Sequence, residues 1–106
     1  MTYDLILGDY TYSTWSLRGW LLFEKFGLKR NLIRVDFSAD QGVAAQLTEF
    51  APSRTVPTVR TPEGAIISES LAIAEELATR FPDAGLWPSD PKARATARNL
   101  AAEMHA

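Results

Sequence analysis

The stretch YTYSTWSLRGWLLFEKFGL, residues 10–28, places four hydroxyl side chains directly before a segment with helical spacing. Its apolar residues recur mostly at intervals typical of an α-helix, and Gly27 follows as a residue suited to the position just past a helix end. These apolar residues are Trp15, Leu17, Leu21, Leu22 and Phe26. We therefore expect a helix over residues 14–26. Hydroxyl residues in this position either cap the helix or contact a ligand, so other parts of the chain have to distinguish these roles.

The segments around this helix predict an α/β domain with the element order β-α-β-α-β-β-α. Short apolar runs have the length of strands, the turn signal PEG separates two of them, and Pro82 ends an amphipathic helix. The residues of this helix expected to face inward are Leu71, Ala74, Leu77, Ala78 and Phe81. The remaining expected elements are strands at 3–8, 30–37, 55–61 and 65–68 and helices at about 40–50 and 69–81.

The last part of the chain predicts the beginning of a second domain. Residues 83–90 form a Pro- and Gly-containing linker, and Asp90 and Pro91 suit the start of a further helix. An isolated amphipathic helix needs a partner surface. We therefore expect a first domain at 1–82 and, at 91–106, the first helix of a truncated helical domain whose complete form dimerises. The apolar stripe of this helix consists of Ala93, Ala97, Leu100, Ala101 and Met104.

Composition excludes several classes of function. The net charge of −2 argues against a nucleic-acid binder, and no apolar run reaches membrane-spanning length, so we expect a cytoplasmic protein. The chain has no cysteine, which excludes disulfides and redox chemistry by a protein thiol. A single histidine, His105, argues against a histidine-built triad or metal cluster. Any thiol chemistry would therefore use the thiol of a ligand.

Two further motifs each allow a structural and a functional interpretation. In VPTV, a cis Val56–Pro57 bond would turn the Val56 backbone outward to an extended ligand, whereas a trans proline at a sheet edge explains the motif equally. In ISES, Glu69 could bind a ligand ammonium and Ser70 a ligand carboxylate at a helix N-terminus. Capping of the helix by Ser68 is the alternative.

The hydroxyl residues of the opening stretch also allow a chemical role. A hydroxyl at the first turn of a helix donates a hydrogen bond to a thiolate, and the helix dipole assists it. Together these effects lower the pKa of a bound thiol from roughly 8.5 towards neutrality. Ser13 and Thr14 are the candidates for this role. Taken singly, each of them is equally explained as a cap.

The ordered set YSTWSLRGWLLFEKFGL, TVPTV and ISESLAIAEELATRF resembles the N-terminal domain of cytosolic glutathione S-transferases. The resemblance covers about residues 3–88, and residues 91–106 are similar to the first helix of that family's C-terminal domain. It implies a thioredoxin-like βαβ-α-ββα fold with a mixed sheet. It also implies glutathione as co-substrate, an electrophilic small molecule as second substrate, and a homodimer, with no metal, nucleic acid or membrane involved.

The resemblance assigns a role to each candidate site residue. Ser13 matches the catalytic serine of serine-type transferases, closest to the zeta-like pattern. Val56, before a cis Pro57, would pair with the cysteinyl part of glutathione. Glu69 and Ser70 match the pair that holds the γ-glutamyl group.

Three points remain open within the resemblance. The glycyl carboxylate would meet Arg54 or Arg34. Tyr10 and Tyr12 allow a tyrosine-type assignment in place of Ser13. Trp15 stands where the zeta pattern has cysteine, which puts an isomerase activity of the maleylacetoacetate type in question.

Two classes of function follow for the whole chain. The first is a glutathione transferase, and the alternative is a non-catalytic module of the same fold that binds glutathione or a protein. Binding to immobilised glutathione followed by a conjugation assay separates them. A glutaredoxin-like oxidoreductase is excluded because the chain has no cysteine.

Overall fold

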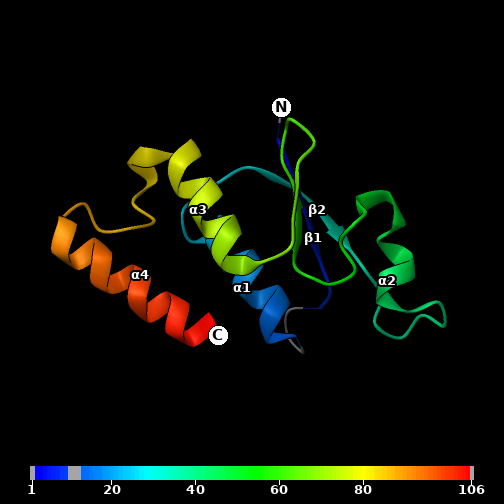
Figure 1. Ribbon diagram of the computed structural model, residues 1–106. Helices are drawn as coiled ribbons and strands as arrows, with labels where there is room; N and C mark the ends of the chain where they lie inside the picture. The colour runs from blue at the N-terminus through cyan, green and yellow to red at the C-terminus, as the bar shows by residue number, and fades with distance from the viewer. Residues whose placement is uncertain (1, 10–12, 106) are drawn as a thin grey trace.

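The computed structural model describes residues 2–9 and 13–105, in which helices cover both faces of a four-stranded sheet (Figure 1). Each segment expected from the sequence forms its element, with ends that differ by a few residues. Single 3-10 turns lie at Thr48–Phe50 and Pro82–Ala84. The elements are β1 (Tyr3–Leu7), α1 (Thr14–Glu24), β2 (Arg30–Arg34), α2 (Gly42–Gln46), β3 (Thr58–Arg60), β4 (Ile66–Ile67), α3 (Ser70–Arg80) and α4 (Pro91–His105).

The sheet is mixed, with the strand order β2-β1-β3-β4. β1 runs parallel to β2, which lies beside it after the α1 crossover. β3 is antiparallel to both β1 and β4, and Val59 lies opposite Leu5 on one side and Ile67 on the other. This arrangement is the βαβ-α-ββα order and mixed sheet expected from the sequence.

The alternating residues of β1 supply both halves of the core. Leu5 and Leu7 pack under α1 and α3, where Phe23 and Leu77 are fully buried. Ile6 points to the opposite face, which α2 and the following turn cover (Figure 1). Strand β1 is therefore buried on both faces. The N-terminal ends of α1 and α3 lie near each other at one end of the sheet.

The buried face of α1 differs from the apolar face expected from the sequence. Ser16, Gly19 and Phe23 face the sheet, whereas Trp15 and Leu21 are exposed. The Ser16 Oγ accepts a hydrogen bond of 3.0 Å from the Gly8 N–H. Small residues on this face let the helix approach the sheet closely, and counting apolar residues alone misses them.

The face of α3 shows a smaller difference of the same kind. Ala74 and Leu77 are buried as expected, and Ile73 is buried beside them. Leu71 is only half-buried, because it turns from the sheet towards the cleft beside α4.

Helix α4 packs on α3 without burying any of its own residues. Its half-buried residues are Arg94, Ala97, Ala101 and His105, a face rotated from the expected stripe. Leu100 and Met104 of that stripe are 58% and 63% exposed. Within residues 2–9 and 13–105, no helix combines the length and apolar character needed to cross a membrane.

Candidate functional site

A pocket of about 470 Å³ lies at the N-terminal ends of α1 and α3 and beside the loop that precedes β3. We call it the site pocket. It brings together six of the residues expected to form the site, although these residues come from three separate segments. They are Ser13, Arg54, Val56, Pro57, Glu69 and Ser70, and the other lining residues are Trp15, Phe37, Val43, Thr55, Ser68 and His105.

Ser13 is the N-cap of α1 and also lines the pocket. Its Oγ accepts a hydrogen bond of 3.1 Å from the Ser16 N–H, so its own O–H proton can still be donated to a ligand. The cap and the ligand contact are therefore compatible. Among the described residues 13–16, Ser13 is the hydroxyl residue that lines the pocket, because Thr14 is exposed elsewhere and Ser16 is fully buried.

Tyr10 and Tyr12, the candidates for a tyrosine-type site, lie outside the described residues. The choice between them and Ser13 stays a prediction.

The loop before β3 carries Arg54, Val56 and Pro57 into the pocket. The Val56–Pro57 bond is cis, and so is the Ala51–Pro52 bond, which the sequence analysis did not single out. The buried Thr58 hydroxyl donates to the Thr55 carbonyl at 2.6 Å and also contacts the Ser53 hydroxyl. These bonds fix the loop against the sheet, because both hydroxyl groups are buried.

The head of α3 presents Glu69 and Ser70. Glu69 is the N-cap residue, and its side chain makes no capping hydrogen bond, so it does not compete for the N–H groups of the first turn. Ser68 lines the pocket but is not the N-cap residue, contrary to the capping alternative. A carboxylate next to these N–H groups would meet the positive end of the helix dipole.

His105 also lines the site pocket, and the sequence analysis missed it. Its Nε2 lies 3.0 Å from Glu69 Oε2, and its Nδ1 lies 3.4 Å from the Ser70 Oγ. Ala97, Ala101 and His105 follow one another at helical spacing of four residues, which places His105 on the face towards α3. That periodicity is the only available sequence signal, and it does not predict a contact across 35 residues.

The cations around the pocket differ in position. Arg54 lines the pocket, whereas Arg34, the other expected candidate, ends β2 and is not among the lining residues. The Arg18 guanidinium stacks 4.2 Å from the centre of the Trp15 ring. It borders a neighbouring apolar cleft of about 350 Å³ between α1, α3 and α4. Arg54 is therefore the arginine that lines the site pocket.

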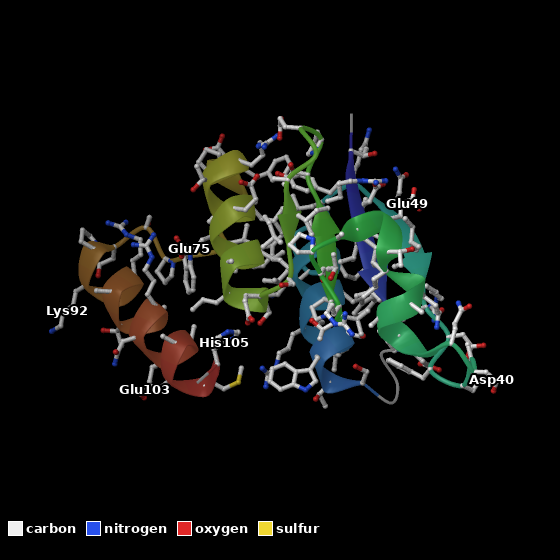
Figure 2. The ribbon with its side chains drawn as sticks, turned by 45° about the vertical axis from the view of Figure 1, so that its right-hand side comes forward. Asp40, Glu49, Glu75, Lys92, Glu103 and His105 are labelled. Atoms are coloured by element: carbon white, nitrogen blue, oxygen red, sulfur yellow. The ribbon has the colours of Figure 1, made fainter. Side chains whose placement is uncertain are left out.

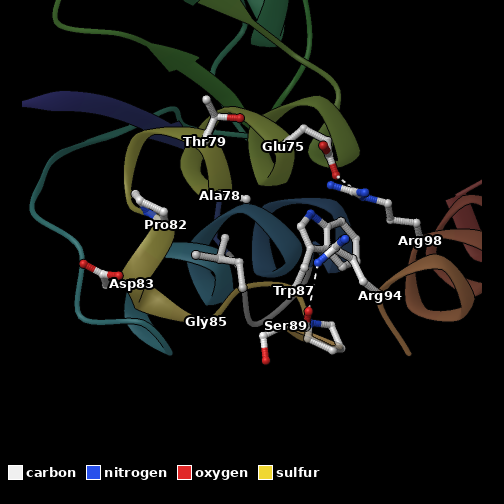
Figure 3. A pocket seen from close by; sticks show the side chains of 12 residues that line it. Glu75, Ala78, Thr79, Pro82, Asp83, Gly85, Trp87, Ser89, Arg94 and Arg98 are labelled. Carbon is white, nitrogen blue, oxygen red and sulfur yellow. Dashed lines mark hydrogen bonds and ion pairs between the residues drawn. The ribbon is translucent and has the colours of Figure 1, made fainter. Parts of the chain in front are cut away.

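A larger cavity of about 670 Å³ lies between α3, the linker and α4 and contains none of the expected site residues (Figure 3). There the Arg98 guanidinium is 3.4 Å from Glu75 and 5.7 Å from the centre of the Trp87 ring. Arg94 donates to the Ser89 carbonyl at 3.0 Å. These contacts attach α4 and the linker to α3, which is a structural role.

The comparisons with known proteins agree with this geometry. A family model for the glutathione S-transferase N-terminal domain matches residues 12–80. A maleylacetoacetate isomerase of Pseudomonas aeruginosa is 36% identical over 97 residues, which are 88% of this chain and 46% of that protein. The fold expected from the sequence, an α/β thioredoxin-like domain with a mixed sheet, is confirmed, and in it β2 runs parallel to β1.

Two of the solved structures that resemble this chain contain bound glutathione. The first, a glutathione transferase homolog from Burkholderia gl BGR1, is 28% identical with a TM-score of 0.78; the match covers 100% of this chain and 55% of that one. A homolog from Sulfitobacter is 27% identical with a TM-score of 0.73, and the match covers 97% of this chain and 48% of that one. The chain thus spans about half the length of these relatives.

Proposed function

The chain belongs to the family of glutathione S-transferase N-terminal domains, and we propose that it binds glutathione in the site pocket and activates the thiol for attack on an electrophilic small molecule. The observation that carries this proposal is the convergence of the six expected residues on one pocket. Its volume, about 470 Å³, falls in the range of about 300–1,000 Å³ typical of small-molecule sites. The two glutathione-bound relatives support the same ligand.

In this proposal each end of glutathione meets a complementary group. The Glu69 carboxylate accepts a hydrogen bond from the γ-glutamyl ammonium. The Ser70 hydroxyl and the N–H groups at the start of α3 donate to the adjacent carboxylate. The Val56 backbone pairs with the cysteinyl residue. Arg54 meets the glycyl carboxylate. The thiol then lies at the head of α1.

Ser13 activates the thiol in the proposed reaction. Its hydroxyl donates a hydrogen bond to the sulfur, and the N-terminus of α1 adds a positive potential, so the thiolate is favoured over the thiol. The thiol proton leaves to solvent. The sulfur lone pair forms a bond to the electrophilic carbon, and either a leaving group departs with its electron pair or the resulting carbanion takes up a proton.

A second candidate reaction is isomerisation of a double bond, which the 36% identity to a maleylacetoacetate isomerase favours. The same thiolate would add to a conjugated double bond and leave again after rotation about the resulting single bond. Glutathione is consumed in conjugation and regenerated in isomerisation. Measuring free thiol during turnover of each substrate class distinguishes these reactions, and binding without turnover of either would indicate a non-catalytic module.

Removal of the Ser70 hydroxyl tests the proposed binding mode. We expect Ser70→Ala to weaken glutathione binding about tenfold, because one hydrogen bond to a charged group contributes about 1.5–3 kcal/mol and tenfold corresponds to about 1.4 kcal/mol. Calorimetric titration measures this loss. Ser68→Ala is the matched control, since Ser68 lines the same pocket outside the proposed contacts. Equal affinity of the Ser70→Ala and Ser68→Ala variants would contradict the assignment.

The second domain and the dimer also remain proposals. We propose that α4 is the first helix of a helical domain, which is supported by the exposed Leu100 and Met104 and by the coverage of only 46% of the Pseudomonas relative. The mass of the natural gene product and its sedimentation equilibrium measure both properties. A natural product of 11.7 kDa that sediments as a monomer would contradict them.

A further inference from the structure

We propose that His105 competes with the γ-glutamyl group of glutathione for Glu69 and Ser70, so that the imidazole weakens glutathione binding. The inference rests on the proposed function, because it assumes that Glu69 and Ser70 bind that group. It adds a ligand-responsive role for α4, which the assignment of the site pocket does not include.

Both ring nitrogens of His105 contact the proposed binding pair. Nε2 is 3.0 Å from the Glu69 carboxylate, and Nδ1 is 3.4 Å from the Ser70 hydroxyl. Figure 2 shows His105 at the end of α4 that lies beside the head of α3. The imidazole thus occupies the carboxylate that the ligand ammonium would need and the hydroxyl that the ligand carboxylate would need.

The two contacts place the imidazole and the ligand in competition for the same groups. The imidazole faces one oxygen of the Glu69 carboxylate, Oε2, so a γ-glutamyl ammonium has to displace the ring or share the carboxylate with it. Because the Glu69 side chain is 71% exposed, solvent screens the pair and the competition is modest.

The charges around His105 identify the group that it contacts. Glu69 lines its surroundings from α3, Arg18 from α1 and Arg54 from the loop before β3. On α4 itself, Arg98 is paired with Glu75. The carboxylate of Glu103 accepts a hydrogen bond from Asn99. Glu69 is therefore the charge in direct contact with the imidazole.

S-methylglutathione is the appropriate probe, because it carries the γ-glutamyl group but no free thiol. We expect His105→Ala to bind it about two- to fivefold more tightly than the unmodified protein, the range of an exposed ion pair. His105→Gln keeps part of the hydrogen-bonding capacity and should bind with an affinity between those two.

Arg98→Gln is the matched control on the same helix. It removes another ion pair between α4 and α3, that of Arg98 and Glu75, away from the site pocket. It should leave the affinity unchanged. If His105→Ala binds no more tightly, or if Arg98→Gln reproduces its effect, the inference is wrong while glutathione binding stands. No binding of S-methylglutathione to any form would instead overturn the proposed function, and the competition with it.

A second measurement observes the displacement directly. His105 is the only histidine of the 106 residues, and the His105→Gln spectrum identifies its ring signals by NMR. These signals should shift when S-methylglutathione is added and should also shift in Glu69→Gln without ligand. Ring signals that respond to neither change would overturn the inference.

Discussion

Ser13→Ala is expected to raise the pKa of the bound glutathione thiol by about one to two units. A hydrogen bond to a charged acceptor contributes about 1.5–3 kcal/mol, and one pKa unit corresponds to about 1.4 kcal/mol. At neutral pH the thiolate fraction then falls, and turnover should fall about ten- to a hundredfold. Glutathione affinity should change less, because Glu69 and Ser70 contribute most of the binding. Thiolate absorbance followed against pH measures the shift.

The substitution also removes the cap of α1, so its controls have to separate stability from chemistry. Ser13 Oγ accepts from the Ser16 N–H, and loss of such a cap costs about 1 kcal/mol. Ser13→Thr keeps both the cap and the donor and should keep most of the thiol shift. Thr14→Val lies next to it on the exposed side and should leave the titration unchanged. The assignment is wrong if Ser13→Ala titrates normally while Thr14→Val or Tyr12→Phe shifts the pKa.

The site pocket could be predicted because its motifs lie where secondary structure begins. Ser13 precedes α1, Pro57 precedes β3 and Glu69 precedes α3. Helix and strand starts carry strong local signals from caps, prolines and periodicity, so the sequence specifies them without knowledge of the tertiary contacts. The mixed sheet then brings the N-terminal ends of α1, β3 and α3 together at the site pocket. Periodicity alone does not predict this arrangement, whereas the family resemblance implied it.

His105 and the inner face of α1 could not be predicted in this way. A contact between His105 and Glu69 depends on the angle at which α4 lies on α3, and no local pattern encodes that angle. Ser16 and Gly19 face the sheet because the backbone approaches closely there, whereas periodicity rules look for large apolar residues. The exposed Trp15 is the complementary error, since a tryptophan counts as apolar although here it lines the site pocket.

Gly19→Ala is expected to distort the site pocket, because it disturbs the packing of α1 against Pro57. A Cβ on residue 19 would lie 2.6 Å from Pro57 Cβ and 3.1 Å from Pro57 Cγ, well inside van der Waals contact. The pyrrolidine ring has no free rotamer, so either α1 or the loop that carries Val56 has to move. Overpacking of this kind costs about 1–3 kcal/mol, and the better helix propensity of alanine offsets about 1 kcal/mol of it.

The functional loss should exceed the loss of stability. Relieving the 2.6 Å contact to an ordinary van der Waals distance takes about 1 Å. A loop displacement of that size separates Val56 from Ser13, between which the reacting cysteinyl residue lies in the proposal, and such misplacement can cost kcat/KM about ten- to a hundredfold. Leu77→Ala is the control for stability. Leu77 is fully buried in the core and does not line the site pocket, so its truncation should cost about 2–5 kcal/mol of stability and leave kcat/KM of the folded protein nearly unchanged. Urea unfolding and glutathione kinetics of both variants measure the two effects. If Leu77→Ala impairs turnover as much as Gly19→Ala does, close packing of α1 against Pro57 is not what positions the loop.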